Sequence, residues 1–271
     1  MNMNDVHTRG LVLLGCGKMG SAMLAGWLAD GLPASSVWVL DPAPSDWLRG
    51  IDGLNLNTSL PPAPAIVLIA VKPQMMGDAL PSIAALGGGD TLFVSVAAGT
   101  PIASYEAVLG AGSPIIRAMP NTPAAVGKGI TAIIGNAQST PAHLDLAEQL
   151  LSAVGQVVRL ADEAQMDAVT AVSGSGPAYV FHLIETLAAA GVAQGLPEPL
   201  AMQLAKATVA GAGDLAEQSG EDPGQLRVNV TSPGGTTQAA LEVLMNEETG
   251  FPALLEKAVR AAADRSRELG A

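Results

Sequence analysis

Two glycine-rich stretches of this sequence are suited to bind an anion through backbone N–H groups. The first, GCGKMG at 15–20, follows an apolar run and leads into a helix-compatible segment. The second, TSPGGTTQAAL at 231–241, combines two glycines with several hydroxyls and also leads into a helix-compatible segment. The first N–H groups of a helix have no partner within it and carry partial positive charge. Both stretches therefore predict a helix start that holds an anionic group.

The first stretch has the Gly-x-Gly-x-x-Gly spacing of a phosphate-binding turn between a strand and a helix. In such a turn the first glycine permits the tight bend, and the second lets the backbone approach a pyrophosphate. The third lets the helix pack closely on the strand. Gly15, Gly17 and Gly20 occupy these three positions. They predict a dinucleotide site, with a purely structural glycine turn as the alternative.

Asp41 ends the next apolar run, VWVL, about 20 residues further on, where an acidic residue accepts hydrogen bonds from the adenosine ribose. Its carboxylate would repel a 2′-phosphate, which favours NADH over NADPH. Because an Asp before Pro42 also forms turns, a purely structural Asp41 is the alternative. Cys16, at the helix start, either has a lowered thiol pKa or is simply a small residue beside the pyrophosphate.

Two more apolar runs end in segments that could line a crevice at the carboxyl ends of strands. These segments are AVKP at 70–73 and VAAGT at 96–100, and both finish with small residues or proline. Lys72 either contacts the cofactor or is a solvated lysine.

The elements that position these residues follow from the apolar pattern. Short apolar runs at 65–71, 91–97, 114–119, 130–135 and 156–160 alternate with helix-like segments, which predicts a mostly parallel sheet. After Leu160 the pattern becomes helical, over 164–172, 177–194, 197–219, 236–247 and 251–270. We therefore expect an α/β fold, with a Rossmann-type, mostly parallel, doubly wound sheet followed by an all-α dimerisation domain. The expected boundaries are 1–162 for the dinucleotide-binding domain and 163–271 for the helical domain.

The helical half is rich in Ala and Gly, as in AAAGVAQG and ATVAGAGDLA. Glycine inside a helix costs about 1 kcal/mol relative to alanine, so several together indicate another helix packed closely against them. A short Ala-rich domain can hardly form a sufficient core alone. We therefore expect an obligate homodimer that buries the remaining apolar faces.

Composition narrows the classes of partner. The net charge of −12 disfavours nucleic acid and anionic membranes. The N-terminal MNMNDVHTRG is polar and no apolar run approaches a membrane span, so we expect a cytoplasmic protein. One cysteine and three histidines without ligand spacing predict no metal site.

Taken in order, AVKP, VAAG, MPNTP (119–123), SGSGPAY (173–179) and TSPGGTTQAAL resemble the pyrroline-5-carboxylate reductase family over nearly the whole chain. The most specific match is DPGQLRVNVTSPGGTTQAALEVL at 222–244. The resemblance implies that NADPH or NADH donates hydride to a cyclic imine substrate, and that proline is the product. It also implies an intertwined homodimer, with a decamer of five dimers in some members, and an active site between the two domains.

The resemblance also assigns site residues by position. It implies cofactor binding by Gly15, Cys16, Gly17, Lys18, Met19, Gly20, Asp41, Asn57, Ala70, Val71, Lys72, Pro73, Ala97, Ala98 and Asn229. It implies substrate binding by Ser232, Gly234, Gly235, Thr236 and Thr237. One departure is that the acidic residue near the substrate in some members falls at or beside Gly220, so the role does not pass automatically to Glu221.

The implied substrate, a five-membered imine with one carboxylate, explains why the second stretch carries hydroxyls rather than Arg or Lys. Backbone N–H groups of Gly234, Gly235 and Thr236 can cradle the carboxylate. The Thr237 hydroxyl is then the catalytic group, hydrogen-bonded to the ring nitrogen. An imine nitrogen can gain a proton from water, so the enzyme needs mainly to orient the substrate.

Two other functions remain open from the residues. A hydroxyacid dehydrogenase also joins a nucleotide domain to a helical one, but it needs a base or cation beside the hydroxyl, and residues 163–205 contain no Lys or Arg. A non-catalytic, nucleotide-sensing dimer would bind cofactor without turnover.

Overall fold

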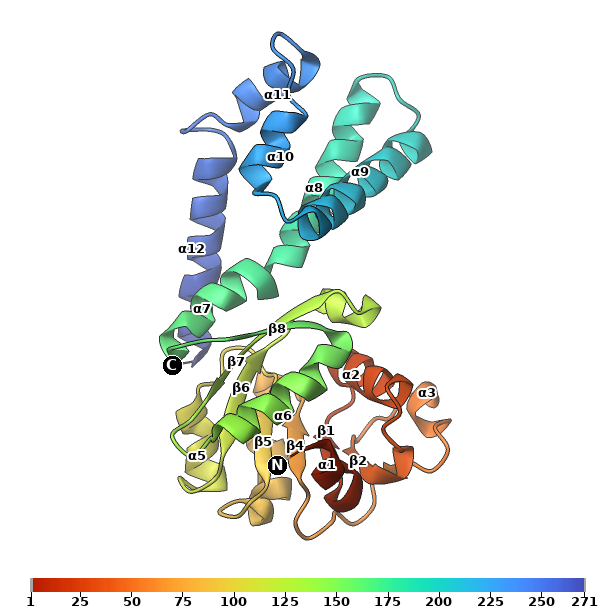
Figure 1. Ribbon diagram of the computed structural model, residues 1–271, viewed down its shortest axis with the longest axis vertical. Helices are drawn as coiled ribbons and strands as arrows, with labels where there is room; N and C mark the ends of the chain where they lie inside the picture. Colours follow the sequence, from red (N-terminus) through yellow and green to blue (C-terminus); the bar gives the residue numbers. More distant parts are fainter. Residues whose placement is uncertain (1, 271) are drawn as a thin grey trace. The chain divides into compact units, whose positions relative to one another are not determined.

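The computed structural model describes residues 2–270 and divides into two compact units (Figure 1). The first unit comprises the residues up to Gly174 together with those from Ala263 onward, and the second comprises Ser175–Ala262. The two units are distinguished only by how compactly their residues pack, which is a different criterion from the functional domains predicted above. The domain boundary expected after residue 162 therefore stays a prediction.

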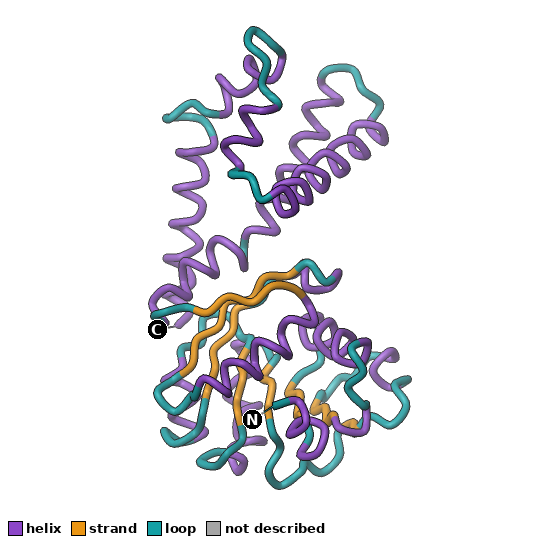
Figure 2. The backbone as a smooth tube through the Cα atoms, viewed as in Figure 1, coloured by secondary structure: helices purple, strands orange, loops and turns teal. Residues whose placement is uncertain are grey.

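The first unit contains one eight-stranded sheet in the order β3-β2-β1-β4-β5-β6-β7-β8, drawn in orange in Figure 2. Neighbouring strands are parallel except for the antiparallel pair β6 and β7. The mostly parallel sheet predicted from the apolar runs is confirmed. The strands are β1 (Leu11–Leu14), β2 (Val37–Leu40), β3 (Asn55–Leu56), β4 (Ile66–Ile69), β5 (Leu92–Ser95), β6 (Ile115–Met119), β7 (Gly129–Gly135) and β8 (Gly155–Arg159).

Helices cover both faces of this sheet, which is why its central strands are apolar throughout. All four residues of β1 are buried. Leu11 and Leu13 belong to a cluster on one face, while Val12 and Leu14 belong to a second cluster on the other. The helices are α1 (Met3–Arg9), α2 (Lys18–Ala29), α3 (Asp46–Arg49), α4 (Met76–Ala79), α5 (Ile102–Leu109), α6 (Pro141–Leu151) and α7 (Met166–Val169).

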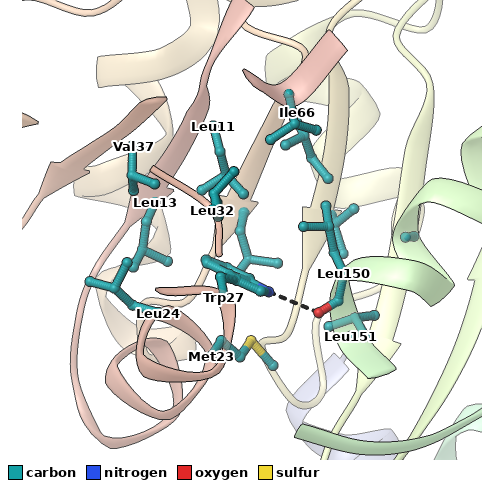
Figure 3. Packing of buried hydrophobic residues seen from close by; sticks show 14 of the residues in the cluster. Leu11, Leu13, Met23, Leu24, Trp27, Leu32, Val37, Ile66, Leu150 and Leu151 are labelled. Carbon is teal, nitrogen blue, oxygen red and sulfur yellow. Dashed lines mark hydrogen bonds between the residues drawn. The ribbon is translucent and has the colours of Figure 1, made fainter. Parts of the chain in front are cut away.

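Trp27 is the largest side chain where α2 packs against α6. Its indole is buried, and Nε1 donates a hydrogen bond of 2.8 Å to the Leu150 carbonyl (Figure 3). A buried indole N–H needs such a partner. This contact helps to fix α2, the helix that starts at the glycine-rich turn.

The second unit is helical and has few buried side chains. Among its described residues the buried hydrophobic side chains are alanines, at 188, 201 and 205, where α8 and α9 pack together. Larger side chains, including Phe181 and Leu254, are exposed. The helices are α8 (Gly176–Ala193), α9 (Glu198–Ser219), α10 (Pro223–Asn229), α11 (Thr236–Leu244) and α12 (Phe251–Gly270), and the last turns of α12 lie in the first unit.

The structure differs from the predicted elements in several places, including the unpredicted two-residue strand β3. Helix α1 forms in the polar N-terminal segment because Asn2 caps it and Val6 is buried. Helix α10 was not predicted over Pro223–Asn229. The helix predicted over 164–172 is only partly α-helical, because Thr170–Gly174 forms a π-helical turn in which Thr170 and Ser173 bond the carbonyls four residues earlier.

Candidate functional site

A cleft of about 800 Å³ lies at the carboxyl ends of the central strands and is called here the nucleotide cleft. The chain leaves β1 for β2 on one side, whereas β4 lies on the other side of β1. Such a reversal of strand order is where open α/β sheets bind ligands. The lining comprises Gly15, Cys16, Gly17, Lys18, Ser21, Ala22, Ala25, Asp41, Pro42, Ala43, Ser45, Trp47, Ala70, Val71, Lys72, Met75 and Ala125.

The segment Gly15–Gly20, called here the glycine turn, cannot carry side chains at two of its glycines. Gly15 has φ 86°, and a Cβ there would lie 2.8 Å from Cγ1 of Val71. A Cβ on Gly20 would lie 2.6 Å from the Gly15 carbonyl oxygen. A Cβ on Gly17, by contrast, meets nothing within 4 Å. The turn is therefore packed on its inner side and open at Gly17.

Helix α2 starts directly after Gly17, which is its N-cap residue and makes no side-chain capping bond. The first N–H groups of the helix thus remain for an outside acceptor. Twelve residues of aligned peptide dipoles add partial positive charge at this end. The turn has the geometry and electrostatics to hold a pyrophosphate.

Asp41 follows β2 and is fixed by backbone N–H groups. Its Oδ2 accepts a hydrogen bond of 2.7 Å from the Cys16 N–H, and its Oδ1 accepts one of 2.8 Å from the Ala43 N–H. Asn57 holds the backbone of Asp41, with Oδ1 accepting from its N–H and Nδ2 donating to its carbonyl. The bond to Ala43 is the turn contact expected of an Asp before a proline. Asp41 thus both forms the turn and faces the nucleotide cleft.

The pKa of the Cys16 thiol contradicts one of the two expectations from the sequence. A helix start suggests a lowered pKa, but burial, followed by the negative charge of Asp41, raises the pKa of Cys16 to about 11. The thiol is therefore neutral at physiological pH. The alternative, a small residue beside the phosphate site, fits this environment.

The other predicted cofactor residues of the first unit do not all line the nucleotide cleft. Ala70, Val71 and Lys72 follow β4 and line the nucleotide cleft, with Lys72 exposed. Pro73 lines a separate cleft of about 400 Å³ that also includes Gly99 and Thr100. The remaining residues, Met19, Gly20, Asn57, Ala97 and Ala98, are outside the lining of the nucleotide cleft.

Sequence reasoning missed an ionic contact beside the loop that follows β5. Arg117 in β6 is buried, and its Nη1 lies 2.8 Å from Oε1 of Glu163. The same carboxylate oxygen accepts a bond of 2.9 Å from the Ile102 N–H at the start of α5. An arginine inside the apolar run PIIRAM was the available signal, because a buried guanidinium requires an anionic partner. The pair fixes the end of the loop that contains Ala97 and Ala98.

In the second unit, residues Ser232–Thr237 form what is called here the substrate loop. Helix α11 begins at Thr236, as predicted, with Gly235 as an N-cap residue that makes no side-chain capping bond. The Gly234 N–H donates to Oε1 of Gln238 at 2.7 Å, and the Gly235 N–H donates to the Ser232 carbonyl at 3.0 Å. Two of the three N–H groups expected to cradle a carboxylate therefore already have partners, one in the loop and one in the first turn of α11.

The N–H groups of Thr236 and Thr237 are in the first turn of α11, where a helix offers no internal acceptor. They are the donors that this loop leaves for a ligand. Gln238, which sequence reasoning missed, keeps the preceding loop in place through Gly234. A glutamine three residues after the N-cap is a recognisable signal for such a bond.

Asn229 ends α10 and belongs to the second unit. Its Nδ2 donates to Oε2 of Glu221 at 2.9 Å, and its Oδ1 accepts from Nε2 of Gln225 at 2.8 Å. Glu221 is thus a direct partner of a predicted cofactor residue. The His182 imidazole lies at an exposed position in α8, with Nδ1 3.2 Å from Oε2 of Glu185.

Over residues 2–270, no group of three or more His, Cys, Asp or Glu side chains could hold a metal ion. Within the same part of the chain, none of the helices has the length and apolar character needed to cross a bilayer.

Comparison with known proteins identifies the family. A family model described as pyrroline-5-carboxylate reductase dimerisation matches residues 163–269, and a model described as NADP oxidoreductase, coenzyme F420-dependent, matches residues 10–99. A pyrroline-5-carboxylate reductase from Pseudomonas aeruginosa is 41% identical over 269 residues, which is 97% of this chain and 98% of that protein. The chain belongs to the pyrroline-5-carboxylate reductase family.

Solved structures of other family members agree with this fold. The pyrroline-5-carboxylate reductase of Coxiella burnetii has a TM-score of 0.90 and 32% identity, covering 97% of this chain and 99% of that one. A Plasmodium falciparum pyrroline carboxylate reductase, solved with NADP bound, has a TM-score of 0.84 and 30% identity, covering 98% and 99%. The family and the fold class expected from the sequence are both confirmed.

The cofactor of this reductase family, NAD(P)H, suits the nucleotide cleft. The glycine turn has an open backbone at Gly17 and a helix start without a side-chain cap. The acidic side chain of Asp41 lies at the end of β2, where the ribose of such a cofactor binds. The expectation of NADPH or NADH as cofactor is confirmed, and the roles of the individual residues stay predictions.

Proposed function

We propose that this chain reduces the C=N bond of 1-pyrroline-5-carboxylate with NAD(P)H, giving L-proline and NAD(P)⁺. One observation carries the proposal: relatives named pyrroline-5-carboxylate reductase, 41% to 43% identical, match 96% to 98% of this chain, through both units. The match thus includes the glycine turn and the substrate loop. It favours catalysis over a nucleotide sensor, which would not need the substrate loop.

The first unit supplies the cofactor site of this proposal. The N–H groups at the start of α2 hold the pyrophosphate, and Asp41 accepts the ribose hydroxyls. Ala70–Lys72 and the loop with Ala97 and Ala98 extend the site toward the nicotinamide, with Asn229 on the nicotinamide side. When bound, the cofactor supplies a hydride, and the protein's task is to fix its position.

The second unit supplies the substrate site. The N–H groups of Thr236 and Thr237 hold the substrate carboxylate at the start of α11. The hydroxyl of Thr237 bonds the ring nitrogen and orients the C=N carbon, which receives the hydride electron pair. The nitrogen brings its proton from water, so the product is a secondary amine and no side chain is consumed. Ser232, Gly234 and Gly235 shape the loop around the carboxylate.

In this proposal, the domain of residues 1–162 binds the cofactor, and the domain of residues 163–271 binds the substrate and forms the dimer. Exposed apolar side chains such as Phe181, Leu204 and Leu254 support burial by a partner copy. We propose a homodimer as the minimal assembly and a decamer of five dimers as the larger one, located in the cytoplasm and without nucleic acid or membrane partners. A folded, active monomer in dilute sedimentation experiments would contradict the dimer.

The direct test follows the absorbance of NADH and of NADPH with 1-pyrroline-5-carboxylate as substrate. We expect oxidation of the cofactor in proportion to imine consumed and proline formed. A 2-keto acid is the control substrate, because a hydroxyacid dehydrogenase would reduce it instead. Oxidation with the keto acid alone would overturn the proposal, and cofactor binding without any turnover would favour a sensor.

A further inference from the structure

The charged side chains of the nucleotide cleft are unevenly placed. Asp41 is the acidic side chain of the lining, and it follows β2. The basic side chains of the lining are Lys18, at the start of α2, and Lys72, which follows β4. Since β2 and β4 lie on opposite sides of β1, Lys72 is across the cleft from the β2 side.

The β2 side is where a dinucleotide places its adenosine ribose. There the lining beside Asp41 consists of Pro42, Ala43, Ser45 and Trp47, all of them neutral. A 2′-phosphate at this position would meet a carboxylate, and this part of the lining contains no arginine or lysine, because Arg49 at the end of α3 is exposed and outside the lining. A 2′-hydroxyl would instead find an acceptor.

Asp41 is also unable to move aside at low cost. One carboxylate oxygen is bonded to the Cys16 N–H and the other to the Ala43 N–H, at 2.7 and 2.8 Å. Asn57 adds two bonds to the backbone of Asp41, at 2.9 and 2.8 Å, from a left-handed conformation with φ 52°. Rotation of the carboxylate would leave two N–H groups without their acceptor. Each carboxylate oxygen still has a lone pair for a ribose hydroxyl.

We infer that Asp41, held by Cys16, Ala43 and Asn57, makes this chain select NADH over NADPH. The inference rests on the proposed dinucleotide site and does not depend on the identity of the imine. The carboxylate accepts the 2′-hydroxyl and repels the 2′-phosphate, and it cannot rotate away to admit the phosphate. Selectivity thus resides in one side chain that the fold keeps in a fixed orientation.

Binding measurements without substrate test this inference separately from catalysis. AMP and adenosine 2′,5′-bisphosphate differ only in the 2′-phosphate, and their dissociation constants can be measured by titration calorimetry on the full chain. We expect wild type to bind AMP at least about tenfold more tightly. Equal binding, or tighter binding of the bisphosphate, would overturn the inference.

Two substitutions and one control test whether the preference for AMP depends on Asp41. Asp41→Ser removes the charge and makes room, and Asp41→Asn removes the charge at nearly constant size. Both should shift the AMP to bisphosphate ratio by about tenfold or more toward the bisphosphate, as should the ratio of kcat/KM for NADH and NADPH. The control Asp52→Asn changes net charge equally at an exposed turn outside the cleft, and it should leave the ratio unchanged.

Thermal melting by circular dichroism shows whether each variant is folded. If Asp41→Ser does not fold, Asp41→Asn and the wild-type ratio still decide the matter. An unchanged ratio in a folded Asp41 variant, or an equal shift in Asp52→Asn, would contradict the role of Asp41. A clear preference for AMP in a chain that fails to reduce 1-pyrroline-5-carboxylate would instead overturn only the proposed function.

Discussion

The glycine turn of the first unit and the substrate loop of the second use the same backbone device, a glycine N-cap that makes no side-chain capping bond. They are held in different ways. In the glycine turn, the sheet and its loops press directly on Gly15 and Gly20. In the substrate loop, Gly234 has open space around its Cα, and a local bond from its N–H to Gln238 maintains the shape.

This difference separates two ways to preorganise a binding site. Packing makes the glycine turn part of the core, so any change there affects both stability and binding. The substrate loop is exposed and depends on a few hydrogen bonds, so changes there can affect ligand binding while the unit stays folded. The following predictions test that contrast, from the largest expected effect to the smallest.

Gly20→Val should disrupt the glycine turn, because even the first carbon of the side chain would lie 2.6 Å from the Gly15 carbonyl. We expect a loss of about 1–3 kcal/mol in the free energy of unfolding and up to about a 100-fold loss of NADH affinity. Urea unfolding and fluorescence titration measure the two. The matched change Gly234→Ala should cost only about 1–2 kcal/mol of backbone strain at φ 69° and leave NADH affinity unchanged. Equal losses of NADH affinity in both variants would contradict the contrast.

The Cys16 thiol should react slowly because burial and the charge of Asp41 raise its pKa. With a pKa of about 11 instead of 9.0, its thiolate fraction at pH 8 is about 100-fold lower than that of an unfolded cysteine, and iodoacetamide labelling should slow accordingly. The folded state holds this proton more tightly than the unfolded state, so the thiol's contribution to stability should decline as pH rises from about 9 to 11. Cys16→Ala should lack that decline. Rapid labelling of the folded protein at pH 8 would show that the thiol is not protected.

Thr237→Ala should lower kcat on the order of 10- to 100-fold, the scale of one positioned hydrogen bond, while NADH binding persists. Steady-state kinetics with 1-pyrroline-5-carboxylate and NADH titration give the two readouts. Thr237→Ser keeps the hydroxyl and should retain most of the activity. Full activity in the alanine variant would refute the catalytic role.

Gln238→Leu should have the smallest effect, because it removes one acceptor from an exposed loop. The Gly234 N–H would lose its 2.7 Å partner, at a cost of about 1 kcal/mol, and KM for the imine should rise about fivefold. Glu242→Gln preserves the acceptor for the Gln238 amide and should change KM little. A reduced melting temperature with an unchanged KM would show that Gln238 serves stability alone.

Most of the fold was predictable because it depends on patterns within short segments. The runs that form β1, β2 and β4 are apolar throughout, and Gly15–Gly20, placed between two such runs, has the spacing of a dinucleotide-binding turn. The two-residue strand β3 was too short to leave such a pattern. The start of α11 at Thr236 was predictable from its glycines and hydroxyls.

The missed contacts join residues that are distant in sequence or depend on side-chain direction. Arg117 and Glu163 are in different elements, and their pairing follows only from the way β6 and the segment after β8 come together. The bond from Cys16 to Asp41 likewise requires β1 and β2 to be neighbours. No local pattern encodes such distances.

By itself, the amino-acid sequence determined the family, most of the order of strands and helices along the chain and the two helix starts that can hold anions. The family follows from the resemblance of several motifs, and the elements and helix starts follow from periodicity and from glycine positions, which act locally. Only the tertiary structure decided that the Cys16 thiol stays protonated, that Asp41 cannot rotate and that two N–H groups of the substrate loop are already engaged. The physical reason is that burial, charge and hydrogen bonding act through space, at distances that folding alone establishes.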